Sequence, residues 1–168
     1  MSTVVLRLGN DVSTDVIYPG RYMATVLPTE TPQYAFADDK EFNARLQAGT
    51  IAPGSVIVAG KNFGCGSSRE QAVSTLVGHG LVIVAEGFAR IFLQNAINLG
   101  LRVVSAPGIR AEERQELEIT EEAVLNISSG KRFPVEQLPQ SRRAIMEAGG
   151  LIAYTRERVL QKTRKGVR

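Results

Sequence analysis

The residues best suited to chemistry stand together in one segment, Asn62-Phe63-Gly64-Cys65-Gly66-Ser67-Ser68-Arg69-Glu70. An apolar run precedes this segment, and residues with helical spacing follow it. Glycines at such a junction let the backbone approach a ligand closely, and the start of a helix offers unpaired N–H groups with partial positive charge. Arg69 adds a planar guanidinium that can donate two parallel hydrogen bonds to a carboxylate. The segment therefore predicts a binding site for an anionic ligand.

A purely structural interpretation competes with this one. The run Ser67 to Glu70 also fits a capping box, in which the serine caps the helix and the glutamate bonds back to it. A capping box leaves three features unexplained: the glycines, the second serine Ser68, and a cation at the N-terminus of the helix, where the helix dipole disfavours positive charge. This excess favours a ligand site.

Length and composition indicate one compact globular domain. The chain has 168 residues, of which 43% are apolar and 22% are charged. Cys65 is the only cysteine, so the chain can form no internal disulfide and cannot hold an iron–sulfur cluster by itself. No apolar run approaches the roughly 20 residues of a membrane helix, and the N-terminus does not resemble a secretory leader. We expect a cytoplasmic protein with no membrane partner.

Positive charge is concentrated at the C-terminal end. Residues 156–168 contain six basic side chains and one acidic side chain, although the whole chain carries a net charge of only +3. This end has no aromatic residues for base stacking, and the remainder of the chain has no excess of positive charge for phosphates. We predict no nucleic-acid partner. The chain is divided into a domain of residues 1–155 and a basic tail of residues 156–168, which is either solvated or docked on a partner.

The hydrophobic pattern predicts an α/β fold. A first strand lies within residues 1–9, and residues 11–21 are expected to form a loop. The order of elements after it is typical of parallel pairing. The expected elements are a helix at 38–48, a strand at 56–59, a helix ending at 78–80, a strand at 81–84, a helix at 88–99 and a strand at 101–104.

The pattern changes after Pro107. Residues 117–119 and 124–127 alternate with period two, and residues 128–131 resemble a hairpin turn before 132–135, so antiparallel strands are expected there. A helix at 139–148 and an apolar run at 151–154 follow. The expected fold class is a single α/β domain with a mixed, partly parallel sheet flanked by helices and an antiparallel C-terminal strand region.

Two motifs resemble those of a known superfamily. Residues 64–70 resemble the Gly-x-Gly-Ser-Ser-Arg-Glu signature of the aconitase superfamily. Residues 11–22, Asp-Val-Ser-Thr-Asp-Val-Ile-Tyr-Pro-Gly-Arg-Tyr, resemble the Asp-Thr-Asp-x-Ile-x-Pro-x-Arg-Tyr motif of isopropylmalate dehydratase small subunits. Residues 87–92 and 95–101 are similar to the segment that follows in this family. The resemblance covers most of residues 4–106 and implies a swivelling β/β/α domain.

The resemblance also implies a reaction. Members of the superfamily remove and re-add a hydroxyl and a proton on adjacent carbons of a malate-like di-acid. A 4Fe-4S cluster on the large subunit binds the hydroxyl, so this chain is expected to bind no metal or cofactor and to form a heterodimer with an iron–sulfur large subunit. The implied activity is the interconversion of 2-isopropylmalate and 3-isopropylmalate in leucine biosynthesis.

Residue roles carried over from the motifs follow the same resemblance. Ser67 would be the base that takes the proton next to a carboxylate, and a serine can do this only if its alkoxide is stabilised, for example by N–H groups. Asp15 would orient the other groups, although an Asp before Pro-Gly often serves only a local turn. The implied loop residues are Gly64, Cys65 and Gly66, and the implied substrate-binding residues are Arg21, Ser68, Arg69, Thr14, Met23, Ala24 and Thr25. For Arg21, a plain surface-loop position is the alternative.

The substrate is less tightly predicted than the reaction. Residues 23–27 would contact the variable group of the substrate, and they contain no cation, which favours an alkyl group over a third carboxylate. Isopropylmalate therefore ranks above dimethylmalate or methylmalate (citraconate), and homoaconitate ranks last. Gln71 stands where the family usually has histidine, which keeps homoaconitase-like members open. An alternative of another class is a non-catalytic anion- or phosphate-binding module, although the Lys-Ser/Thr ending of a P-loop is missing.

Overall fold

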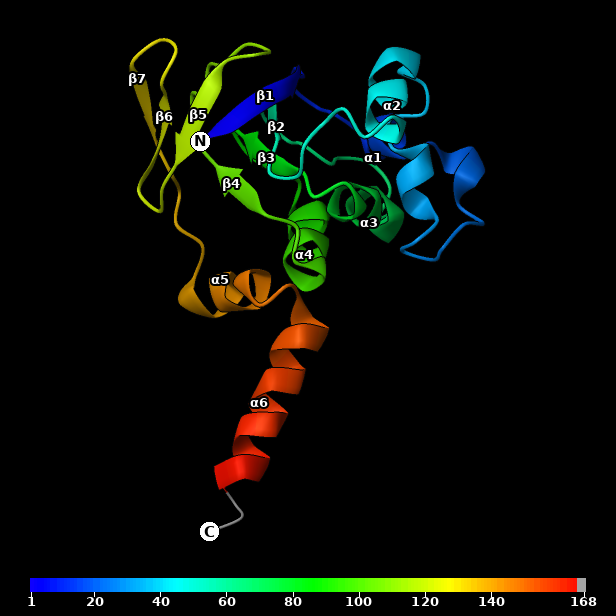
Figure 1. The fold of residues 1–168 in the computed structure, drawn as a ribbon, viewed down its shortest axis with the longest axis vertical. Coiled ribbons are helices and arrows are strands. Elements are labelled where there is room, and N and C mark those ends of the chain that lie inside the picture. The colour runs from blue at the N-terminus through cyan, green and yellow to red at the C-terminus, as the bar shows by residue number, and fades with distance from the viewer. Residues whose placement is uncertain (166–168) are drawn as a thin grey trace.

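A seven-stranded mixed sheet forms the body of the protein, as the computed structural model shows for residues 1–165 (Figure 1). The strand order is β4-β3-β2-β1-β5-β6-β7. The pairs among β1 to β4 are parallel, and the pairs from β1 to β5 through β7 are antiparallel. The strands are β1 (Ser2–Arg7), β2 (Val56–Ala59), β3 (Val82–Ala85), β4 (Val103–Ser105), β5 (Glu116–Ile119), β6 (Ala123–Asn126) and β7 (Lys131–Pro134).

Within residues 1–165, six α-helices and two short 3-10 helices connect and flank the strands. The α-helices are α1 (Thr14–Ile17), α2 (Lys40–Gln47), α3 (Glu70–Gly78), α4 (Arg90–Leu99), α5 (Gln140–Glu147) and α6 (Leu151–Lys165). The 3-10 helices are η1 (Gly20–Tyr22) and η2 (Thr31–Tyr34). The predicted fold class is confirmed, with parallel pairing before Pro107 and antiparallel pairing after it.

The central strands are apolar on both faces because each face is covered. In β2, Ile57 and Ala59 pack into a cluster with helices α2, α3 and α4, whereas Val56 and Val58 pack into a second cluster with β5 and β6. The sheet curls far enough that Ser105, at the end of β4, forms an antiparallel bridge with Glu136, just beyond β7. Both faces are therefore removed from water, and these strands read as continuous apolar runs.

Helix α6 extends away from the body (Figure 1). Gly149 and Gly150 both have positive φ, and a Cβ atom at Gly150 would overlap the carbonyl of Asn98 at the end of α4. The two glycines therefore allow the chain to turn closely against α4 before α6 begins. Residues 156–165 of the predicted tail are helical and continue the apolar run 151–154 without a break.

The expectation of a plain loop at residues 11–21 is wrong. This segment contains α1 and the first residues of η1. The side chain of Ser13 caps α1 by accepting a hydrogen bond from the N–H of Val16, at 3.4 Å. A helix of four residues is too short to show a hydrophobic period, so only its cap could have indicated it.

Candidate active site

The glycine segment is held by the residues of the other motif. The N–H of Gly64 donates to the carbonyl of Val12, and the N–H of Thr14 donates to the carbonyl of Cys65, both at 2.8 Å. Gly64 has φ +81, and a Cβ atom there would overlap the ring of Phe92 on α4. Glycine is therefore required at this position by both conformation and space. The two sequence motifs lie side by side in the structure.

Ser67 and Ser68 are exposed and line a cavity of about 210 Å³ at the start of α3. Thr14, Gly64, Gly66 and Arg69 line the same cavity. The first turns of α4 form its other wall, with Arg90 and Asn95. Thr14, Ser68 and Arg69, which were predicted to bind substrate, thus meet Ser67 at one cavity, although they come from two segments of the chain.

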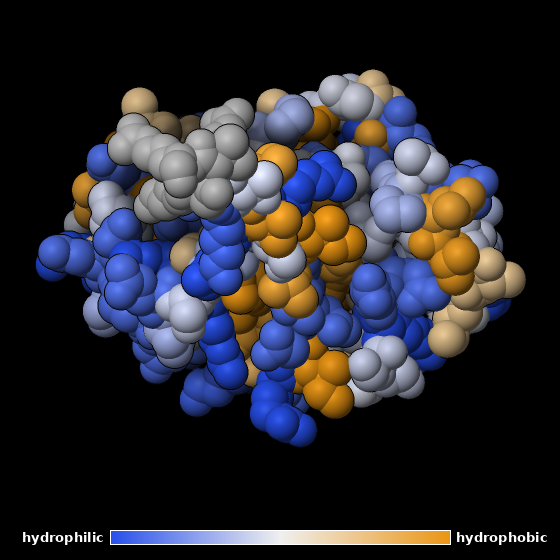
Figure 2. Space-filling model, turned by 90° about the horizontal axis from the view of Figure 1, so that it is seen from below, coloured by the Kyte–Doolittle hydropathy of each residue, from blue (hydrophilic) through white to orange (hydrophobic). Residues whose placement is uncertain are grey.

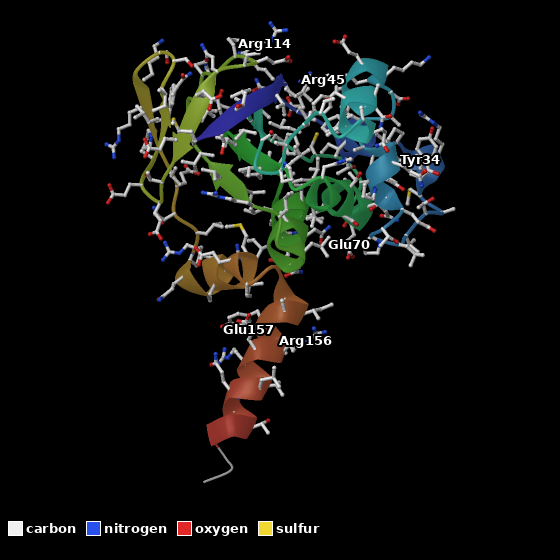
Figure 3. All side chains as sticks on the ribbon, in the orientation of Figure 1. Tyr34, Arg45, Glu70, Arg114, Arg156 and Glu157 are labelled. Carbon is white, nitrogen blue, oxygen red and sulfur yellow. The ribbon has the colours of Figure 1, made fainter. Side chains whose placement is uncertain are left out.

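The capping-box alternative, in which Ser67 caps helix α3, is wrong. Helix α3 begins at Glu70, its N-cap residue is Arg69, and no side chain caps it. Glu70 is exposed at the first turn of α3 (Figure 3). The N–H groups of Ser67 and Ser68 have no hydrogen-bond acceptor within residues 1–165. The hydroxyl of Ser67 and these donors are therefore available to a ligand.

Arg69 and Asp15 form an ion pair at the edge of the cavity. Nη1 of Arg69 donates to Oδ1 of Asp15, and it also lies 3.3 Å from the carbonyl oxygen of Tyr18. The Arg69 side chain is only 11% exposed, and its Nε has no partner within the described residues. The guanidinium has further N–H donors besides those of Nη1 and Nε, so this group suits an incoming carboxylate.

Asp15 bonds the backbone of its own segment in addition to Arg69. Its Oδ1 accepts the N–H of Gly20 at 3.1 Å, which fixes the turn before η1. The hydrogen bond from Arg69 holds the pKa of the Asp15 carboxyl below its usual value, so this side chain stays ionised at neutral pH. The contact of Asp15 with Arg69 is the one that its predicted orienting role requires, and the contact with Gly20 is the one that a turn role requires.

Arg21 does not line this cavity. Its guanidinium pairs with both carboxylate oxygens of Asp38, at 2.5 and 3.3 Å, and lies over the ring of Tyr22 with 4.7 Å to the ring centroid. The pair with Asp38 raises the pKa of Arg21 and lowers that of Asp38. Nothing in the sequence pattern pointed to Asp38, because the contact depends on how residues 31–38 fold back on η1.

The segment predicted to meet the variable group of the substrate lies beside this arginine. Met23 and Ala24 are exposed, and Thr25 is partly buried. The hydroxyl of Tyr18 bonds the carbonyls of Tyr22 (3.1 Å) and Thr25 (3.4 Å), and Nε2 of Gln71 donates to the carbonyl of Met23 at 3.3 Å. Gln71 thus connects the start of α3 to this segment. None of the three predicted contact residues lines the cavity around Ser67.

A second cavity, larger than the one around Ser67, lies away from the predicted site residues. It has a volume of about 620 Å³ and lies between α5 and the ends of β4 and β5. None of the predicted site residues lines it. The described residues contain no group of three or more histidine, cysteine or acidic side chains arranged to hold a metal ion. The cavity at the start of α3 is therefore the candidate active site.

Comparison with known proteins identifies the family of this chain. The family model described as the aconitase C-terminal domain matches residues 17–107. A 3-isopropylmalate dehydratase small subunit of Moorella thermoacetica is 40% identical over 157 residues, covering 90% of this chain and 92% of the relative. This chain belongs to the family of 3-isopropylmalate dehydratase small subunits, which have an aconitase C-terminal domain.

Archaeal members of this family are equally similar. The isopropylmalate/citramalate isomerase small subunit of Methanocaldococcus jannaschii is 40% identical over 163 residues and covers 94% of both chains. The crystal structure of a 3-isopropylmalate dehydratase (leuD) from the same organism superposes with a TM-score of 0.87 at 37% identity, covering 97% of both chains. No helix within residues 1–165 has the length and apolar character needed to cross a membrane.

Proposed function

We propose that this chain is the small subunit of a hydro-lyase that interconverts 2-isopropylmalate and 3-isopropylmalate by dehydration and rehydration. The observation that carries the proposal is the meeting of Ser67 and Arg69 at one cavity, where the N–H groups of Ser67 and Ser68 have no acceptor among the described residues. A di-acid binds there with one carboxylate on Arg69 and on the N–H donors. Ser67 then lies next to the carbon that gives up its proton.

The chemistry of this chain is proton transfer and positioning. Ser67 accepts the proton, and other unpaired N–H groups in the first turn of α3 stabilise its alkoxide form. General-base catalysis of this kind contributes on the order of 100- to 10,000-fold in rate. Asp15 keeps Arg69 in place through their ion pair. A carboxylate fixed by Arg69 determines which carbon faces the serine.

The hydroxyl of the substrate needs a Lewis acid, and this chain has too few thiolates to hold an iron–sulfur cluster by itself. A 4Fe-4S cluster normally takes several thiolates, whereas Cys65 is the single cysteine. When bound in the large subunit, the cluster would withdraw electron density from the leaving hydroxyl. The proposed partner is therefore an iron–sulfur large subunit, and this chain alone is inactive.

Helix α6 is the proposed contact for that partner. Seen from the side of α6, apolar residues gather in the middle of the face and hydrophilic residues border them (Figure 2). On α6 itself, Ile152, Val159 and Leu160 are exposed, and Arg156 and Glu157 project from the helix (Figure 3). An isolated helix of 15 residues is only marginally stable in water, so a partner surface would stabilise it.

The substrate side chain is expected to be an alkyl group. Met23, Ala24 and Thr25 carry no charge, so a carboxylate there would find no partner among these three residues. Citramalate is a second candidate substrate class, because the M. jannaschii relative is named an isopropylmalate/citramalate isomerase. Dimethylmalate and homoaconitate remain lower-ranked alternatives.

Substitution of Ser67 by alanine in the complex with the large subunit tests the proposal. We expect kcat to fall by about 100-fold or more while KM changes little, because the lost group acts mainly in the transition state. Ser129→Ala, an exposed hairpin serine remote from the cavity, is the matched control. Equal, mild effects of the two substitutions would reject Ser67 as the base, and activity of the isolated chain would reject the need for a partner.

A further inference from the structure

Thr14 forms two hydrogen bonds to the loop that contains Ser67. Its side-chain hydroxyl donates to the carbonyl of Ser67 at 2.9 Å, and its N–H donates to the carbonyl of Cys65 at 2.8 Å. Thr14 is only 2% exposed, so the donor side of these bonds is buried. One buried residue therefore fixes the carbonyl groups on both sides of Gly66.

We propose that Thr14 is a positioning residue that orients the peptide group between Ser67 and Ser68, so that the N–H of Ser68 binds a carboxylate of the substrate. This inference rests on the proposed function. It adds the N–H donor of Ser68 and the residue, Thr14, that holds this donor in place. Thr14 itself acts through the loop and not through direct contact with the reacting atoms.

Peptide geometry links the two ends of this group. A trans peptide is planar, and its C=O and N–H point in opposite directions. The C=O of Ser67 points to the buried hydroxyl of Thr14, so the N–H of Ser68 points away from it. This N–H has no acceptor within residues 1–165, and Ser68 lines the cavity. A donor held in place and left unpaired suits an anionic ligand.

The loop has few other constraints at this point. Gly66 is exposed with φ +87, and a Cβ atom there would find only ordinary contacts with Ser13 and Thr14. Ser67 and Ser68 are exposed, and neither caps α3. Without the hydroxyl of Thr14, rotation of the Ser67–Ser68 peptide would meet little resistance from packing.

The first test compares two substitutions at this position in the complex with the large subunit. Thr14→Val keeps the shape and removes the donor, whereas Thr14→Ser keeps the donor. We expect Thr14→Val to lower kcat roughly tenfold to 100-fold, a part of the effect of removing an oxyanion donor outright. Thr14→Ser should recover most of that turnover.

Thr75→Val provides the matched control. The hydroxyl of Thr75 also donates to a buried carbonyl, that of Thr31 at 2.9 Å, but Thr75 does not line the cavity. Thr75→Val should lower the melting temperature and leave kcat unchanged at a temperature where the protein is folded. If Thr14→Val behaves in the same way, or if Thr14→Ser is as harmful as Thr14→Val, the proposal is wrong.

The second test does not depend on turnover. The full-length chain labelled with ¹⁵N is titrated with 3-isopropylmalate, and the amide resonance of Ser68 is followed by NMR. It should shift in the wild type and in Thr14→Ser, and the shift should be largely lost in Thr14→Val. An equal shift in Thr14→Val, or none in the wild type, overturns the proposal. If the assembled enzyme is inactive towards alkyl malates but this pattern holds, the proposed function fails and the role of Thr14 stands.

Discussion

The guanidinium of Arg69 and the carboxylate of Asp15 form an ion pair across 54 positions of the sequence. Arg69 is largely buried in this pair, whereas the Asp15 side chain is 59% exposed. The pair joins the Gly-Ser-Ser-Arg loop to the segment that carries Arg21. The orientation of Arg69 therefore depends on a residue of the other motif.

Replacement of Arg69 tests whether the shape of its guanidinium matters in addition to its charge. Arg69→Lys keeps the charge but cannot donate to Asp15 and to a substrate carboxylate with one planar group. We expect KM to rise and kcat to fall, each by roughly tenfold or more. Steady-state kinetics of the assembled enzyme measures both, with Arg45→Lys on α2 as the control. Unchanged KM in Arg69→Lys would exclude Arg69 from substrate binding.

Acid should break the pair between Asp15 and Arg69 only at low pH. The folded state lowers the pKa of Asp15, so the contribution of the pair to the free energy of unfolding is fully present above the ordinary carboxyl pKa near 4. It is lost as the pH falls through the lower folded-state value. Urea unfolding from pH 3 to 7 should therefore show a smaller acid dependence in Asp15→Asn than in the wild type. Parallel curves would mean that Asp15 has no shifted pKa.

Asp38 should compete with substrate for Arg21. The two side chains are paired through both carboxylate oxygens, so two of the five N–H donors of Arg21 are engaged and its charge is balanced by Asp38. Asp38→Asn weakens the competing pair, and we expect KM to fall severalfold if Arg21 binds substrate. Glu41→Gln, an exposed neighbour on α2, is the control for loss of negative charge. A rise in KM for Asp38→Asn would show instead that Asp38 holds Arg21 in its productive position.

Helix α6 should contribute to binding of the large subunit. Leu160 is 54% exposed on this helix, and Leu160→Asp places a charge within its apolar surface. We expect the Kd for the large subunit, measured by calorimetry, to rise about tenfold or more. Ile127→Asp is the control, because Ile127 is an exposed apolar residue beyond β6. An unchanged Kd would remove α6 from the interface, and dissociation of a homodimer by Leu160→Asp would assign α6 to contacts between two copies.

The sequence alone determined most elements of the fold. Period-two and helical spacing are local properties, so strands such as β2 and helices such as α4, with its cap at Gly100, could be placed from the residues. The glycine segment likewise indicated an anion site, because a capping box explains neither its glycines nor Ser68 and Arg69. The four-residue helix α1 was missed, since it is shorter than the pattern that would reveal it.

Only the tertiary structure decided which groups meet. Sequence spacing does not show that Thr14 bonds the carbonyl of Ser67, that Asp15 pairs with Arg69 or that Asp38 pairs with Arg21. These contacts join segments that the sheet and the packing of α1, α3 and α4 bring together, and contact energies between distant residues leave no periodic trace in the chain. A local pattern therefore indicates what a segment can do, whereas packing determines which partners it has.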